Sequence, residues 1–158
     1  MSEEIKAKSQ ELSMMRSAVL HRFLYFGVGL VIIVALILAF LVIPSVLKDT
    51  SSQADPKTAV PGISFVIMLH LVIAASLLRT ILLNKRRVRI EKGLLIGLGV
   101  LLLLLSLMVL DGASAYKSHI DPVMHRVPFS MFICGCFNFI AAVITFLVAG
   151  FSKQGKSV

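Results

Sequence analysis

Residues 93–110 read GLLIGLGVLLLLLSLMVL, a run of eighteen residues without a charge. At about 1.5 Å per helical residue, the run forms a helix about 27 Å long, close to the ~30 Å thickness of a bilayer's hydrocarbon core. A helix that is apolar on every side needs apolar surroundings on every side. The run therefore predicts a helix that lies in lipid.

Three further apolar runs have comparable lengths. Together the four runs cover approximately residues 23–47, 62–83, 93–110 and 128–151. The 158-residue chain is 58% hydrophobic and 15% charged, whereas a soluble domain has about a quarter charged residues. A soluble protein of this size lacks the elements needed to cover four such helices. We predict an all-α fold in which residues 1–158 form one integral membrane four-helix bundle.

The segment before the first run, residues 1–22, has the pattern of an amphipathic helix. Ser2 can cap its start, and Ile5, Leu12, Met15 and Val19 recur at helical spacing. We expect a cytoplasmic lead-in helix on the membrane surface. The alternative is a helix that docks on a cytoplasmic partner. The first run is too long for a signal-peptide core, so we expect it to be a retained span.

The charges divide unequally between the two sides of the predicted bundle. The N-terminus, residues 84–92 and the C-terminal tail, with Arg79 near the end of the second run, hold twelve basic and four acidic residues. The other two links, residues 48–61 and 111–127, hold four of each. The first set therefore carries the whole net charge of +8. Since lysine and arginine near span ends stay in the cytoplasm, we predict that both termini are cytoplasmic.

The link between the second and third runs is strongly basic. We expect its side chains to contact anionic lipid headgroups, at about 1 kcal/mol per basic residue. These residues are Lys85, Arg86, Arg87, Arg89 and Lys92. No aromatic residue lies among them to stack on bases, so we predict that nucleic acid is not a partner.

Gly93 and Gly97, followed by Gly99, lie at the cytoplasmic start of the third run. Small residues four apart allow another helix to approach closely. We expect these glycines to serve packing within the bundle. The alternative is an interface between copies of the chain.

Few polar residues lie deep in the runs. From the outer ends of their runs, His70 lies about 12 Å deep, Asn138 about 15 Å and Ser106 about 6 Å. Polar side chains in hydrocarbon are costly unless they are paired, so they face the bundle interior. We predict an intramembrane polar site in which His70 and Asn138 approach within direct or water-bridged hydrogen-bond distance. A clasp between helices is the favoured interpretation, and proton or ion passage is the alternative.

Haem and metal sites have weaker support in the sequence. A haem between spans commonly needs two axial histidines at one depth, and His70 is the one deep histidine among four. A haem would therefore need His70 from two subunits, or a weaker axial ligand such as a methionine in place of the second histidine. Asp111, His119, Asp121 and His125 lie in or beside one outer link, but their spacing matches no metal motif. We expect no metal and no cofactor, with haem as the least favoured option.

Cys134 and Cys136 are two residues apart inside the fourth run, so on a helix they point in different directions and should not pair. No catalytic triad, paired intramembrane carboxylates or phosphate-binding glycine loop is present, so we expect no enzyme.

These features predict a multi-pass protein of a cell membrane, favouring a bacterial inner membrane, with an organelle membrane as the alternative. The leading functional hypothesis is a non-enzymatic accessory or assembly subunit, whose partners are lipid and other membrane subunits or further copies of the chain. The alternatives are a small transporter or channel that oligomerises through the third span, and a haem-binding electron-transfer subunit.

Overall fold

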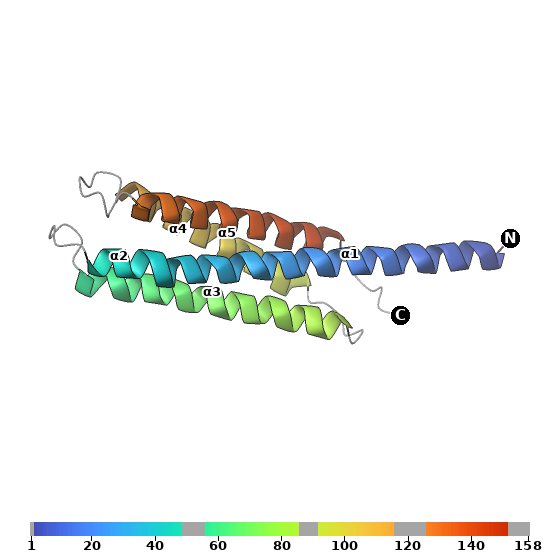
Figure 1. Ribbon diagram of the computed structural model, residues 1–158. Coiled ribbons are helices and arrows are strands. Elements are labelled where there is room, and N and C mark those ends of the chain that lie inside the picture. The colour runs from blue at the N-terminus through green and yellow to red at the C-terminus, as the bar shows by residue number, and fades with distance from the viewer. Residues whose placement is uncertain (1, 49–55, 86–91, 116–125, 152–158) are drawn as a thin grey trace.

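The computed structural model describes residues 2–48, 56–85, 92–115 and 126–151, and these residues form helices. The elements are α1 (Ser2–Ile37), η1 (Leu38–Val42), α2 (Ile43–Leu47), α3 (Pro56–Lys85), α4 (Lys92–Ala115) and α5 (Arg126–Phe151). Helices α1, η1 and α2 join end to end into one long rod. This rod, α3, α4 and α5 lie side by side along a common direction (Figure 1).

Each of the four rods is long and apolar enough to cross a membrane. The candidate spans are Ala18–Leu47, Ala59–Leu83, Lys92–Ser114 and Val127–Phe151. They begin or end within about five residues of the four predicted runs, because helix continues into the more polar residues that flank each run. The prediction of an all-α chain with four potential spans is confirmed. The side of the membrane that holds the termini stays a prediction.

Helix α1 lies between α3 and α5 and contacts both, while α4 packs mainly on α5. Helices α3 and α4 have few close backbone contacts. The buried apolar side chains form two clusters along the bundle. The cluster nearer the termini includes Leu24, Leu77 and Leu102, and the cluster at the opposite end includes Val42, Val109 and Val127. The interior is therefore two apolar layers stacked along the helix axes.

Three glycines allow α4 and α5 to approach closely. A Cβ atom added at Gly99 would lie 2.9 Å from the Phe146 ring, and one at Gly112 would lie 2.7 Å from Cε of Met131. A Cβ atom at Gly135 would lie 2.6 Å from both Cγ and Cδ2 of Leu110. Each glycine therefore receives a side chain of the opposite helix. Small residues have this role wherever packing, and not exclusion from water, holds helices together.

A π-helical turn, η1, ends at Val42, two residues before Pro44 in the first rod. Proline has no N–H to donate, and its ring collides with the carbonyl of the preceding turn. The wider turn accommodates this residue: the Ile43 N–H donates to the Leu38 carbonyl, five residues back. The Ser45 hydroxyl donates to the Leu41 carbonyl over 2.7 Å. A local widening of the helix thus replaces the sharp kink that an interior proline commonly causes, and the rod continues to Leu47.

The N-terminal part of α1 extends beyond the bundle in line with the first span (Figure 1). Residues 2–17 precede the span and are about 24 Å long at helical rise. Residues 2–26 contain neither glycine nor proline, so nothing in the backbone breaks the helix before the bundle. The amphipathic segment expected over residues 1–22 is therefore continuous with the span and follows the bundle axis.

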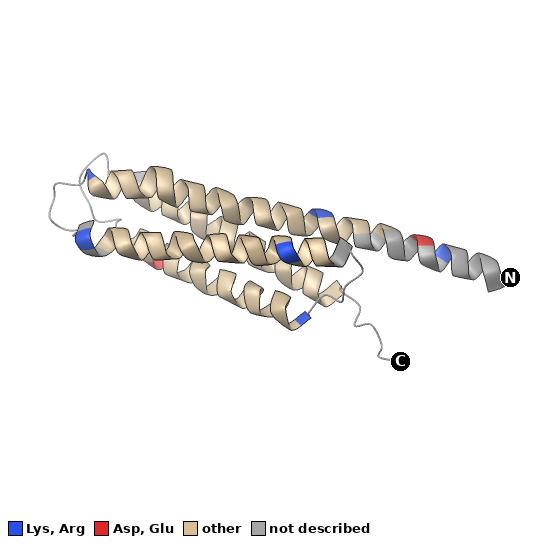
Figure 2. Cartoon of the chain, turned by 90° about the horizontal axis from the view of Figure 1, so that it is seen from below, with Lys and Arg blue, Asp and Glu red and all other residues tan. Residues whose placement is uncertain are grey.

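Charged residues of the described segments lie towards the two ends of the bundle and on the α1 extension (Figure 2). By their positions in the elements, Arg22, Arg79 and Lys92 lie towards the end that holds the N-terminus. Lys48, Lys57 and Asp111 lie towards the opposite end. The middle of the bundle is free of charge in these segments, as expected of a region that contacts hydrocarbon.

The α4–α5 contact can be tested with one methyl group. We expect Gly135→Ala to lower the free energy of unfolding by about 1–3 kcal/mol, because the new methyl overlaps Leu110 at the branch of its side chain. Gly97→Ala is the matched control, since a Cβ atom there meets nothing within 4 Å. Unfolding in mixed detergent micelles measures both variants. Equal stability of the two variants would contradict the close-packing account.

Candidate functional site

The structure brings His70 of α3 and Asn138 of α5 into direct contact. Nε2 of His70 lies 3.0 Å from Oδ1 of Asn138, and Nδ1 lies 2.7 Å from the carbonyl oxygen of Val66. Both residues have 0% of their surface exposed. The pair therefore links two helices deep in the bundle, at the level that their depths in the sequence predicted.

The number of hydrogens on the His70 ring depends on the orientation of the Asn138 amide. The Val66 carbonyl can only accept, so Nδ1 carries a hydrogen and donates it. With Asn138 Oδ1 facing Nε2, that nitrogen must donate as well, which requires a charged ring. A half-turn of the amide instead points Nδ2 at Nε2, and the ring stays neutral. Nδ2 has no partner in the present orientation, so the half-turn gives this buried donor an acceptor.

Both ring nitrogens of His70 are thus occupied by protein groups. An imidazole that binds haem iron must present one free nitrogen to the metal. Ligation by His70 would require loss of the bond to Val66 or of the bond to Asn138. Both side chains are fully buried, so no water-sized space adjoins the pair in this structure. The arrangement is suited to holding α3 against α5.

Ser106 forms a second polar link, separate from the first. Its hydroxyl donates to the Gly135 carbonyl over 2.8 Å and joins α4 to α5. Gly135 and Asn138 are three residues apart on α5, which places them on neighbouring positions of one helix face. Helix α5 therefore receives a polar contact from α3 and another from α4.

This polar level lies between the two apolar clusters. Two residues pack against both clusters. They are Val66, whose carbonyl contacts His70, and Phe137, which precedes Asn138 in the chain. His70, Asn138 and Ser106 are buried to 98% or more. The three residues predicted to form one intramembrane polar site therefore share a layer but form two separate hydrogen bonds.

The three glycines at the start of α4 have different surroundings. Gly99 packs inside the bundle against Phe146, whereas a Cβ atom at Gly93 or Gly97 would meet nothing within 4 Å. Gly93 and Gly97 are exposed, and Gly99 is buried. Packing within the bundle therefore accounts for Gly99 alone.

The other predicted site residues lie at the helix ends or beyond the described segments. Lys85 ends α3 and Lys92 begins α4, while Arg86, Arg87 and Arg89 lie outside the described residues. Asp111 is exposed near the end of α4, and His119, Asp121 and His125 also lie outside them. Among the described residues, no three His, Cys, Asp or Glu side chains are grouped as metal ligands would be. Cys134 and Cys136 are free thiols.

Sequence reasoning missed several residues of the polar interior. Thr80 and Thr145 are buried, and each hydroxyl donates to the carbonyl four residues back, at 2.9 Å and 2.8 Å. Such local bonds satisfy a hydroxyl in lipid without help from another helix. Gly112 and Gly135 were also missed. Each of these glycines is recognised by the large side chain that faces it on the other helix. That pairing becomes visible only once the register of α4 against α5 is known.

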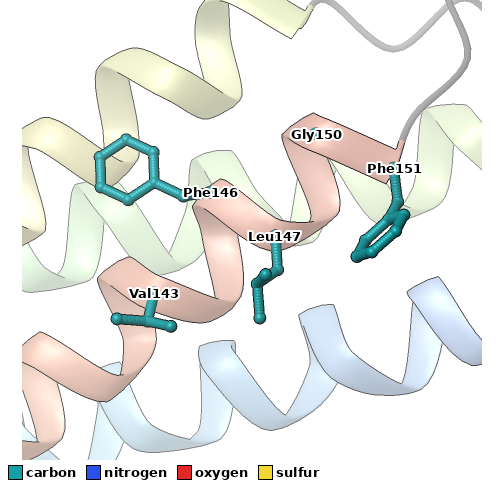
Figure 3. A pocket seen from close by; sticks show the side chains of 5 residues that line it. All are labelled: Val143, Phe146, Leu147, Gly150 and Phe151. Carbon is teal, nitrogen blue, oxygen red and sulfur yellow. The ribbon is translucent and has the colours of Figure 1, made fainter.

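A shallow depression of about 410 Å³ lies on α5 towards the end that holds the termini (Figure 3). Its lining consists of Val143, Phe146, Leu147, Gly150 and Phe151. This lining has no polar side chain, so no side chain there can form a hydrogen bond with a polar ligand. Lipid acyl chains suit such a surface, and the depression is separate from the His70–Asn138 pair.

No protein-family model matches the chain, and neither a curated protein nor a solved structure matches it. The class of the protein therefore follows from its helices. The chain is a multi-pass membrane protein with four candidate spans, and a buried polar layer joins three of its helices.

A double-mutant cycle tests the contact between His70 and Asn138. We expect a coupling energy of about 0.6–1.7 kcal/mol from the wild type, His70→Ala, Asn138→Ala and the double variant, because the first substitution removes the partner of the second. The free energy of unfolding in mixed micelles gives all four values. A cycle of Ser76→Ala with Asn138→Ala is the control, since the Ser76 hydroxyl donates within its own helix. A coupling no larger than the control's would show that the pair contributes no stability.

Proposed function

We propose that the protein is a non-enzymatic accessory or assembly subunit of a membrane complex, with both termini in the cytoplasm. The observation that carries this proposal is the complete burial of His70 and Asn138 in contact with each other. The polar groups best able to move protons or hold a ligand are here engaged in joining helices. The role of such a bundle then depends on what its outer surface contacts.

The outer surface supports the same proposal. Large apolar side chains are exposed on every rod, among them Phe40, Phe65, Met108 and Phe129 at 58–72% exposure. Lipid or other apolar helices must cover such side chains. The segments between the rods, residues 49–55, 86–91 and 116–125, are short in sequence relative to the helices, so the surface available for contact with a partner is mainly helical.

Isolation from native membranes tests the proposed role. We expect a tagged full-length chain, extracted in mild detergent, to retain another membrane protein at fixed stoichiometry. The double variant His70→Leu/Asn138→Leu should retain the same partner at the same ratio, because it changes only the interior. Recovery of the chain without a partner at fixed stoichiometry would refute the role of assembly subunit.

Flux measurements separate this role from the transporter or channel. We expect liposomes that contain the purified chain to pass protons no faster than empty liposomes, as reported by an internal pH dye, because no water-sized space adjoins His70 or Asn138. Faster flux that disappears in both His70→Ala and Asn138→Ala would establish proton passage instead.

A separate experiment tests the orientation of the chain in the membrane. The charge difference between the two ends supports cytoplasmic termini, whereas the helices alone do not define the orientation. We expect a cysteine at Ser52 to react with an impermeant maleimide from outside intact cells, and a cysteine at Lys8 to react only after the membrane is opened. Both native cysteines are replaced by alanine in these variants. Reaction at Ser52 only from the cytoplasmic side would reverse the assignment.

A further inference from the structure

The outer side of the first rod, over α1 and η1, carries an apolar stripe that continues beyond the bundle. The stripe has a residue at every seventh position: Ile5, Leu12, Val19, Phe26, Ile33 and Phe40. Of its described side chains, Val19 is 49% exposed, Phe26 59% and Phe40 72%. The described members, from Val19 to Phe40, face away from the rest of the bundle, and helical spacing continues the stripe into the extension at Leu12 and Ile5.

The opposite side of α1 changes character where the bundle begins. Leu24, Val31 and Leu38 face the interior and are at most 1% exposed. The earlier positions on that side, at the same seven-residue intervals, are Glu3, Gln10 and Ser17. The positions of the extension in line with the bundle core are thus polar, whereas the outward positions are apolar apart from Lys8.

The other helices of the bundle leave the extension uncovered, and its described side chains, Lys8, Glu11 and Met15, are exposed. Residues 2–17 lie before the first candidate span and continue along its axis (Figure 1). The other helices pack on the opposite side of α1. An uncovered apolar stripe on a helix in water requires a partner, since most helical stability in water comes from packing of an apolar face.

The stripe has the spacing of a coiled coil. Between its members lie Met15, Arg22, Gly29 and Leu36, so the outward positions alternate at intervals of four and three residues. Met15 is 61% exposed, Leu36 is 49% exposed, and a Cβ atom at Gly29 would meet nothing within 4 Å. This is the a and d pattern of a heptad repeat, with Val19 at an a position and Met15 at a d position.

We propose that two copies of this chain pair through their α1 helices, as a parallel coiled coil that runs from the extension into the membrane. Two copies inserted in the membrane in one orientation have parallel α1 helices. Their apolar stripes can then pack against each other along their whole length. In this register Glu11 is a g position and Arg16 is the e position five residues later. Opposite charges at g and the following e of the partner helix select parallel pairing.

Two further positions agree with this register. The open Gly29 lies within the span and lets the two backbones approach closely in lipid. Arg22 occupies a d position near the start of the span, where its long side chain can reach the headgroup phosphates. Lys8 occupies another d position. Polar residues at core positions lower stability but define the register and the number of strands.

This pairing goes beyond the proposed function and does not depend on it. Self-association is measured on the purified chain alone, without a partner protein. A chain that pairs but retains no other protein would contradict the accessory role only. A chain that retains a partner but does not pair would contradict the present inference only.

Cysteine crosslinking in lipid nanodiscs or native membranes tests the pairing. In the full-length chain with Cys134→Ala and Cys136→Ala, we expect Val19→Cys to form disulfide-linked dimers on mild oxidation. Ser17→Cys, on the opposite side of the same helix, should give about tenfold less dimer. Equal dimer at the two positions, or none at either, would overturn the inference.

Charge reversal tests the partner and the register together. We expect Glu11→Lys to weaken crosslinking at Val19→Cys by roughly tenfold, because two symmetric ion pairs become repulsive. Adding Arg16→Glu to the same chain should restore it. Failure of the double variant to recover would reject this register.

Gly97→Ile separates this interface from one through α4. The substitution fills the open face of α4 and should leave crosslinking at Val19→Cys unchanged. Loss of the dimer in Gly97→Ile with no effect of Glu11→Lys would place the contact on α4 and refute pairing through α1.

Discussion

The absence of water around the spans governs the arrangement of this protein. In hydrocarbon, each polar group must find its partner within the protein, since none is available outside. His70 meets this requirement through Asn138 on another helix, and Ser106 meets it through the Gly135 carbonyl. Thr80 and Thr145 meet it within their own helices. The two interhelical bonds set the rotation of α3 and α4 relative to α5, because only one face of each helix carries the polar group.

The packing around α5 follows from the same bonds together with the glycines. Ser106 can reach a backbone carbonyl on α5 only where the helices approach closely, and Gly99, Gly112 and Gly135 permit that approach. Helix α3 has a longer side chain at the corresponding place, and the histidine reaches Asn138 without close backbone packing. The bundle thus combines one tight helix pair, α4 and α5, with a diagonal contact made by longer side chains.

Much of this organisation could be predicted from local properties of the chain. Run lengths predicted four helices, and position within the runs placed His70 and Asn138 at one level, because depth in a helix follows directly from residue number. The rotation of a helix about its own axis, relative to its neighbours, does not follow from residue number. The sequence therefore grouped Ser106 with the pair, although its hydroxyl bonds to Gly135, and it treated Gly93, Gly97 and Gly99 alike, although only Gly99 is covered. The continuation of α1 along the bundle axis also required the fold, since a periodic apolar stripe does not define the direction of a helix.

The sequence by itself determined the surroundings of this protein, the number of its potential spans and the uneven charge of its two ends. These are sums over neighbouring residues, and hydropathy, length and charge need no contact between distant segments. Only the tertiary structure decided which helices are neighbours, which polar group meets which, and which glycines remain open. Those outcomes depend on the register and rotation of one helix against another, and these are set by side chains far apart in the chain. The outward direction of the α1 stripe belongs to this second group, because the three other helices define which side of α1 is left uncovered.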